Sequence, residues 1–435
     1  MRKFVLGASA ALAVAAAEAV AAPPTPAPIV PVMPSDMDVV PAQGGGGAPI
    51  ESIGGTPIDM GVPMTGAADV LTGTGRSRSR FYAEGSYLLL WTNDGTLPIP
   101  IATGGPSLGI AGGQGTTTLL GSGPVDYGNM NGLKVAVGGF FGDSSVGMEL
   151  NGMYLGRKTV TGTAGPSSTT VIARPFFDPT SRTENSVVVA APGAFNGGVQ
   201  MTNSLEAYSF EVNPFFRVAE GGAVTIDLIA GFRYFQHAET LNIYAGSSLQ
   251  PGGVSAFNGF GIAAPATILV HDRFGAHTTF YGGNLGAKLS FGRNRLFLDL
   301  TGKVAIGGVN QNLSVDGTSN VLSGGGFVAP ASTQGGFLTA GNQLGERTES
   351  RFAVLPEGSA QLGFQVTSWA NIFAGFQVSY LSSVARPQEQ ISRTIPGTSL
   401  PTSPNYIRTT GQRTTMIVDD DFFLYGFNFG MTISF

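Results

Sequence analysis

The sequence predicts an all-β fold, namely a transmembrane antiparallel up-and-down β-barrel of about ten strands, within a range of about eight to twelve. Three observations predict it: the alternation of residue types in the last segment, the sorting of connections into short and long ones, and a composition low in charge. The last segment reads FFLYGFNFGMTISF, with large apolar residues at odd positions from Phe423 to Phe435 and small or polar ones at even positions from Gly426 to Ser434. Because side chains alternate between the two faces of a strand, one face is apolar and the other is not. This pattern is typical of a lipid-facing barrel strand, whereas the alternative is an edge strand of a soluble sandwich.

The composition supports a surface that faces lipid. Charged residues make up 12% of the 435 residues and apolar residues 42%, with 65 Gly and 29 Phe. That charged fraction is about half the usual one. The absence of cysteine excludes disulfides, thiolate metal sites and a cysteine nucleophile. The net charge of −5 argues against a nucleic-acid partner.

The first 80 residues are expected to lie outside the barrel. Residues 1–22 are typical of a cleaved signal peptide, with Arg2 and Lys3 before an Ala-rich apolar stretch and small residues before Pro23. An uncleaved membrane anchor is the alternative. Residues 23–80 are rich in Pro and Gly and predict a flexible periplasmic linker, although they could also enter the lumen as a plug. The barrel then occupies 81–435.

From Phe81 onward the chain alternates strand-like segments with connections of two lengths. The expected strands are 81–92, 131–142, 145–158, 205–217, 223–244, 276–292, 295–317, 350–368, 371–385 and 421–435. Short turns are expected at 142–145, 219–222, 292–295 and 368–371, and long loops at about 93–130, 159–204, 245–275, 318–349 and 386–420. Short periplasmic turns and long extracellular loops are the pattern of outer-membrane barrels, and an even strand count puts both ends of the barrel on the periplasmic side.

Charged residues in these strands fall on the face opposite the apolar one. In 223–244, for example, Leu228 and Phe232 share one face, while Asp227 and Arg233 share the other. Since an isolated charge in lipid costs several kcal/mol, these side chains should face the lumen. The residues expected to face the lumen are Lys134, Glu149, Glu211, Arg217, Asp227, Arg233, Lys288, Asp299, Lys303 and Glu357. Around a water-filled constriction they would set ion selectivity, whereas in a narrow barrel they would pair and plug the bore.

Several short stretches resemble an uncharacterised outer-membrane β-barrel porin family that is common in planctomycete bacteria. The stretches are YAEGSYLLLW at 82–91, DRF at 272–274, FYGGNLG at 280–286, GKVAIG at 302–307, GGFL at 335–338, FAVLPE at 352–357, VARPQEQI at 384–391 and GFNFG at 426–430. Each motif is weak alone, and their order and spacing over 81–435 carry the resemblance. It implies an outer-membrane barrel with a porin label, and it supplies neither catalytic residues nor a known substrate.

The function expected from these features is passive passage of small hydrophilic solutes through the outer membrane. The alternative is a plugged structural or surface-interaction barrel that acts through its extracellular loops. No enzyme activity, cofactor or metal is expected, because His237, His271 and His277 complete no ligand set or catalytic triad in the sequence. The expected partners are outer-membrane lipid and, through the last strand ending in Phe435, the barrel-assembly machinery. Solute and oligomeric state stay open.

Overall fold

The computed structural model describes residues 81–435 except 107, 168, 324–331 and 409–415. The predicted signal peptide at 1–22 and the predicted linker at 23–80 lie outside the described residues. No helix in the described part of the chain is both long and apolar enough to cross a membrane.

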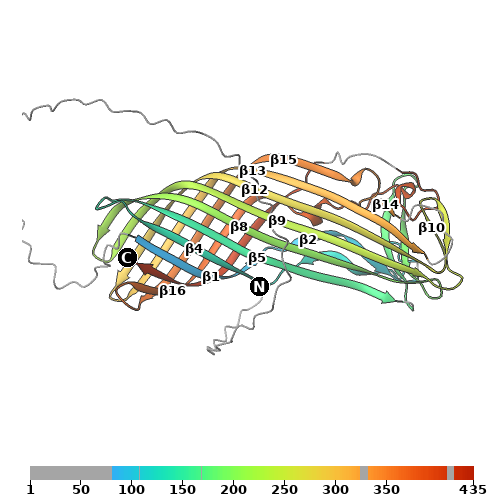
Figure 1. Ribbon diagram of the computed structural model, residues 1–435, viewed down its shortest axis with the longest axis horizontal. Coiled ribbons are helices and arrows are strands. Elements are labelled where there is room, and N and C mark those ends of the chain that lie inside the picture. The colour runs from blue at the N-terminus through green and yellow to red at the C-terminus, as the bar shows by residue number, and fades with distance from the viewer. Residues whose placement is uncertain (1–80, 107, 168, 324–331, 409–415) are drawn as a thin grey trace, which may run out of the picture. The chain divides into compact units, whose positions relative to one another are not determined.

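Ten antiparallel strands form a closed ring in which each strand pairs with its neighbours along the chain, and the first strand pairs with the last. The ring strands are β1 (Phe81–Thr92), β4 (Met130–Phe140), β5 (Val146–Ser167), β8 (Phe195–Gly221), β9 (Val224–Leu249), β12 (Ala266–Arg293), β13 (Leu296–Ser323), β15 (Gly345–Gln365), β16 (Ala370–Ala385) and β17 (Asp419–Ser434). The predicted up-and-down barrel is therefore confirmed. Figure 1 shows these strands running obliquely side by side.

The predicted short turns close the periplasmic end of the ring. Only two residues connect β8 to β9, and two connect β12 to β13. Gly222 and Asn294 in these turns have φ of 57° and 58°, the left-handed conformation that tight hairpins require and that Gly and Asn adopt most easily. At the same end, Phe435 donates its backbone N–H to the carbonyl oxygen of Phe81.

The long connections contain more structure than the sequence predicted. The described residues there include the strands β2 (Gly95–Gly104), β3 (Thr117–Val125), β6 (Ile172–Asp178), β7 (Thr183–Ala190), β10 (Val254–Phe257), β11 (Phe260–Ala263) and β14 (Ser332–Gln334), and the short 3-10 turns η1 (Gly341–Gln343), η2 (Pro387–Gln390) and η3 (Gly397–Ser399). β3, β2, β6 and β7 form a sheet of their own, and β10 pairs with β11. β5, β8, β9, β12 and β13 also continue far into the segments predicted as loops.

Two belts of aromatic side chains on the outer face mark the membrane. The periplasmic belt consists of Phe81, Phe141, Phe216, Phe291, Phe364, Trp369 and Phe435, and the opposite belt of Tyr154, Tyr208, Tyr234, Tyr281, Phe352, Phe423 and Tyr425. On β12 the belts are ten positions apart, from Tyr281 to Phe291. A tilted transmembrane strand needs about nine to eleven residues, so this distance matches one bilayer. Aromatic rings at both interfaces are typical of outer-membrane barrels.

The alternation of residue types reverses at the second belt. Below it, the outward residues of β12 are apolar, as at Leu285, and the inward ones polar, as at Asn284. Above it, Phe274 and Phe280 point inward and are buried, while Arg273 and His277 are exposed on the outer face. Lipid therefore surrounds the strands only up to the belt, and water surrounds them beyond it. We call the described part beyond this belt the extracellular head.

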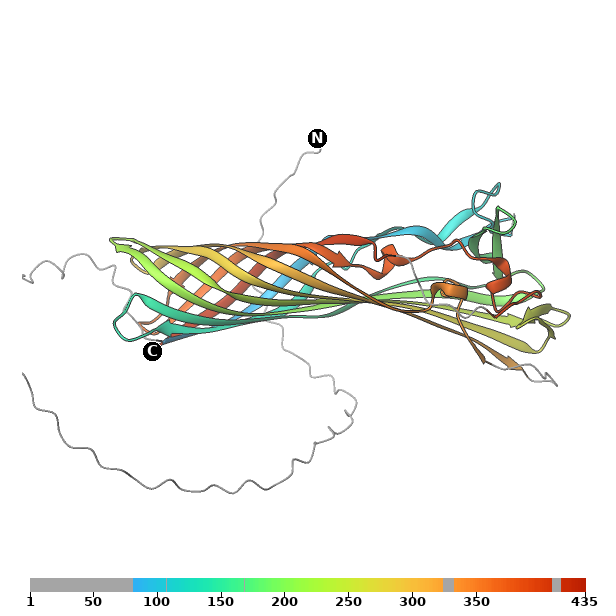
Figure 2. The same ribbon diagram turned by 90° about the horizontal axis from the view of Figure 1, so that it is seen from above.

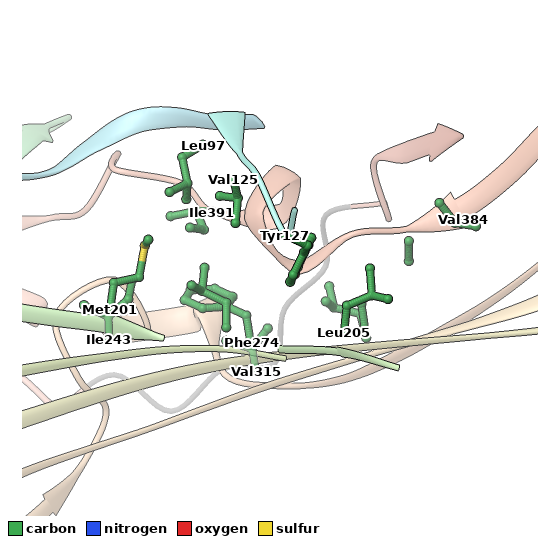
Figure 3. Close-up of a cluster of buried hydrophobic side chains, with 14 of the residues drawn as sticks. Leu97, Val125, Tyr127, Met201, Leu205, Ile243, Phe274, Val315, Val384 and Ile391 are labelled. Carbon is green, nitrogen blue, oxygen red and sulfur yellow. The ribbon is translucent and has the colours of Figure 1, made fainter. Parts of the chain in front are cut away.

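The extracellular head has two layers with an apolar core between them. The upper halves of β8, β9, β12 and β13 form one layer, and β2 with the segment after β16 lies opposite (Figure 2). Figure 3 shows Met201, Ile243 and Phe274 from the first layer facing Leu97 and Ile391 from the second. This core explains the length of the ring strands, because their upper halves bury side chains against the inserted segments.

The position of the lipid boundary leads to a test on a single strand. Leu285 lies on the lipid face of β12 and is 58% exposed, while His277 lies on the same face above the belt. Leu285→Arg should lower the free energy of unfolding by about 2–4 kcal/mol, whereas His277→Arg should change it by about 0–1 kcal/mol. The measurement is urea unfolding from phospholipid vesicles, followed by the fluorescence of Trp91 and Trp369. Equal costs for the two substitutions would contradict the boundary.

Candidate functional site

Five charged side chains from five strands meet inside the ring at membrane depth. Lys303 Nζ lies 2.7 Å from Glu211 Oε2 and 3.3 Å from Glu357 Oε1. Arg233 Nη1 lies 2.5 Å from Glu357 Oε2 and 3.5 Å from Glu211 Oε1. Lys134 Nζ lies 3.8 Å from Glu357 Oε1. Three cations therefore share two carboxylates in a single network, which we call the bore network.

The bore network crosses the lumen. Arg233 on β9 and Glu357 on β15 are separated in the ring by β12 and β13, yet their side chains touch. Asn284 donates from Nδ2 to Glu211 Oε2 over 3.1 Å, and Asn213 donates to the same oxygen over 2.8 Å. Since contacts between non-adjacent strands are possible only across the inside of a ring, these side chains reach across the bore at this depth. Pairing and hydrogen bonds offset the desolvation of these buried charges.

The other predicted lumen residues form pairs closer to the periplasmic turns. Arg217 holds Asp227 through two hydrogen bonds, from Nε at 2.8 Å and from Nη2 at 3.1 Å. Lys288 Nζ lies 3.3 Å from Asp299 Oδ2. Glu149 accepts a hydrogen bond from the hydroxyl of Tyr82. The structure thus brings five of the predicted residues into one network and places the other five in separate contacts.

Above the bore network, inserted segments are fixed to the barrel wall by buried polar groups. Glu239 on β9 accepts hydrogen bonds from the Tyr127 hydroxyl and from Gln388 Nε2, the latter over 3.1 Å. Tyr127 precedes β4 and Gln388 lies in η2, so both residues belong to inserted segments. The pKa of Glu239 is raised, because the effect of burial exceeds the opposing effect of the nearby Arg386. Glu239 therefore attaches two inserted segments to one strand of the ring.

Arg386 makes a second attachment, on the opposite side of the inserted segment. It is fully buried, and its Nη2 donates to Asn93 Oδ1 over 2.7 Å and to the backbone oxygen of Asp421 over 3.0 Å. Its Nε lies 2.7 Å from Asp420 Oδ2. Asp420 and Asp421 belong to β17, so this arginine fixes the start of the inserted segment after β16 to the ring. Together, Glu239 and Arg386 attach the inserted segments to the inner side of the ring.

The three histidines lie on two paired strands, β9 and β12, rather than in a loop, and His237 faces inward while His271 and His277 face outward. His237 points inward, and its ring centroid lies 4.6 Å from that of Phe422. His271 stacks on Tyr244 at 4.3 Å on the outer face, and His277 is also on the outer face of β12. Among the described residues, no group of three or more histidines, cysteines or carboxylates is placed to hold a metal ion. That no metal or cofactor is used stays a prediction.

Several residues that shape the interior were missed in the sequence. Tyr127, Arg174 and Gln388 lie in segments expected to be loops, where no alternation indicates which side chains point inward. Arg174 does stand out, because it lies in the apolar stretch VIARPFF at 171–177. A single arginine in such a stretch is a usable signal of a buried charge.

One family comparison agrees with the barrel architecture. Residues 82–435 match the family described as Putative beta barrel porin-7 (BBP7). No curated protein sequence matches the chain significantly. The crystal structure of outer membrane protease OmpT from Escherichia coli is similar at 11% identity, over 82% of this chain and 98% of that one, with a TM-score of 0.37. Outer-membrane expressed OmpT of Vibrio cholerae follows at 9% identity, over 82% of this chain and 97% of that one, with a TM-score of 0.13.

Removal of one acid from the bore network should be costly. Glu211→Gln leaves three cations with one carboxylate in a buried site, so we expect it to lower the free energy of unfolding by about 3–5 kcal/mol. Glu206→Gln on the outer face of the same strand is the matched control, because it breaks an exposed pair with Arg157. That change should cost less than about 1 kcal/mol. Urea unfolding from vesicles measures both, and similar costs would show that the network contributes no more than a surface pair.

His237 should make the stability of the protein depend on pH. Burial, together with the charges of Arg386 and His277, lowers the pKa of His237 to about 3. Below about pH 6.5 the unfolded chain takes up a proton at His237 while the folded chain does not. The free energy of unfolding therefore decreases as the pH is lowered, by up to about 1.4 kcal/mol per pH unit down to about pH 3. His237→Phe should flatten this slope, and His277→Asn should retain most of it. Thermal unfolding of the detergent-folded proteins between pH 7.5 and 4.5 measures the slopes; an unchanged slope in His237→Phe would refute this assignment.

Proposed function

The chain belongs to the family described as Putative beta barrel porin-7, and from this premise we propose that it is a closed outer-membrane barrel that works through its extracellular head. The observation that carries the proposal is that the bore is crossed twice. The bore network reaches across it at membrane depth, and the inserted segments held by Glu239 and Arg386 are attached to the ring above.

The chemistry of the bore network and of the inserted segments above it supports a bore that is closed permanently rather than transiently. A passing solute would have to separate buried ion pairs at one level and displace an apolar core at the next. Losing a partner from a buried ion pair costs about 3–5 kcal/mol, and opening an apolar core exposes further surface to water. Barrels of about eight strands have an interior that side chains can fill, and ten strands enclose only slightly more.

A passive channel for small hydrophilic solutes is the second candidate. The bore network favours it, because charged and amide side chains could line a water-filled passage if they parted, which an apolar filling could not do. The porin name of the family points the same way. In this candidate the inserted segments would act as a gate.

Four further proposals complete this function. Residues 1–22 would be a signal peptide that is cleaved on export, and residues 23–80 a periplasmic linker, because of their composition. The alternating strand β17 would be the segment that the barrel-assembly machinery recognises. We also propose that the protein is not an enzyme, since the charged side chains of the bore network are paired with one another.

Single-channel recording separates the two candidates. Purified protein folded in detergent, shown by circular dichroism to be β-sheet, should give no conductance steps in a planar bilayer if the bore is closed. Stable steps whose ion selectivity changes in Arg233→Glu or Asp299→Lys would instead establish the channel and refute the closed barrel. Arg157→Glu, on the outer face, is the control that should leave any conductance unchanged.

A further inference from the structure

The extracellular head contains a pocket of about 250 Å³ that the proposed closure does not use. It lies between β7, β9, β12 and residues 400–402, well above the bore network. This volume is far more than the roughly 30 Å³ of one water molecule, and slightly below the range of about 300–1,000 Å³ for pockets of drug-sized ligands. The pocket is therefore suited to a small organic molecule.

Arg174 is the charged residue among those that line the pocket, and it is held firmly. Its Nη1 donates to Asp272 Oδ2 over 2.9 Å, and its Cζ lies 4.3 Å from the ring centroid of Phe337. The other oxygen of Asp272 accepts hydrogen bonds from the backbone N–H and the hydroxyl of Thr339, at 3.0 and 2.9 Å. Three separate elements, β6, β12 and the segment after β14, thus fix the guanidinium in one orientation.

Two donors of this guanidinium are unused. Arg174 is 1% exposed, yet neither its Nε nor its Nη2 has a hydrogen-bond partner in the described structure. Buried polar groups nearly always have partners, because an unpaired buried donor costs free energy. The pKa of Arg174 is lowered, because the effect of burial exceeds the opposing effect of Asp272. Since a guanidinium loses its proton only far above neutral pH, the side chain remains a cation.

The positions of the unused donors specify the ligand group. Nε and one N–H of Nη2 point in parallel along one edge of the guanidinium, the edge that binds both oxygens of a carboxylate. Asp272 is bonded to a different nitrogen, Nη1, so no group of the described structure is paired with this edge. A carboxylate here would satisfy both donors at once.

The walls of the pocket specify the rest of the ligand. Most of them are apolar, formed by Val187, Val189, Phe195, Ile268, Val270 and Leu400. The hydroxyls of Ser247 and Ser319 already donate to the backbone oxygens of Val189 and Gly335, both over 2.8 Å. The pocket therefore offers one fixed polar anchor in an apolar surround, which suits a single acid group on a short hydrocarbon body.

We propose that this pocket binds a small monocarboxylate with a short apolar body, anchored by the Nε and Nη2 edge of Arg174. The half-buried residues Ser186, Ser255 and Thr402 lie on its rim. The inference does not depend on whether the bore conducts, because the pocket and the bore network share no residue. It gives the extracellular head a ligand of defined chemistry.

Isothermal titration calorimetry of the full-length, detergent-folded protein tests this proposal with acetate, butyrate, hexanoate, butyramide and inorganic phosphate as probes. Binding should strengthen from acetate to butyrate as apolar surface is buried, and weaken again once the chain exceeds the pocket. Butyramide, which lacks the charge, should bind at least about tenfold more weakly than butyrate. Equal binding of butyramide and butyrate, stronger binding of phosphate, or no saturable binding of any acid would overturn the proposal.

Two variants separate the anchor from the walls. Arg174→Lys keeps the charge but removes the two-donor edge, so butyrate should bind at least about tenfold more weakly. Ser255→Phe fills the pocket from its half-buried rim on β10, a strand that does not pair with β6, so it should abolish binding while the melting temperature is kept. Arg393→Lys, in a half-exposed pair with Glu184 beside β7, is the matched control and should bind as the wild type does. If Arg174→Lys fails to fold, unchanged binding in Ser255→Phe still refutes the site.

Discussion

The height at which lipid ends determines the rest of this structure. Below the belt that includes Tyr281, a side chain on the outer face must be apolar, because no water is present to solvate a polar one. Above the belt, the same face meets water and becomes polar, as at Arg273 and His277. A strand that crosses this boundary has to exchange the roles of its two faces, and β12 does so within a few residues.

The two kinds of contact inside the ring, polar below the belt and apolar above it, follow from this exchange. Where the outer face is committed to lipid, the inward positions carry the polar residues, and in a ring of ten strands those residues are close enough to pair across the bore. Where the outer face is polar, the inward positions are apolar and require an apolar partner. The inserted β2 and the segment around Ile391 supply that partner, because upper strand halves with exposed apolar inner faces would not be stable in water.

The same exchange explains how far the sequence predicts the fold. The alternation from Phe423 to Phe435 and the short turns predict every ring strand, since lipid imposes one rule on all of them. Above the belt the rule reverses, so segments such as 195–204 and 266–275 read as loops although they continue β8 and β12. Lumen residues can be recognised by the face they occupy. Their partners cannot, because the pairing of Arg233 with Glu357 depends on which strands face each other across the ring.

The extracellular head is held together differently from the barrel below it, which bears on where function resides. The barrel depends on lipid outside and ion pairs inside, whereas the head is a two-layer structure with an apolar core between its layers. A buried charge is expensive in such a core, and the Arg174–Asp272 pair with its two unused donors is not needed to fill space. Replacing such a pair by apolar residues is often neutral or stabilising, so its presence is better explained by a ligand than by stability. This favours a role for the head in recognition, supported by a barrel that anchors it in the membrane.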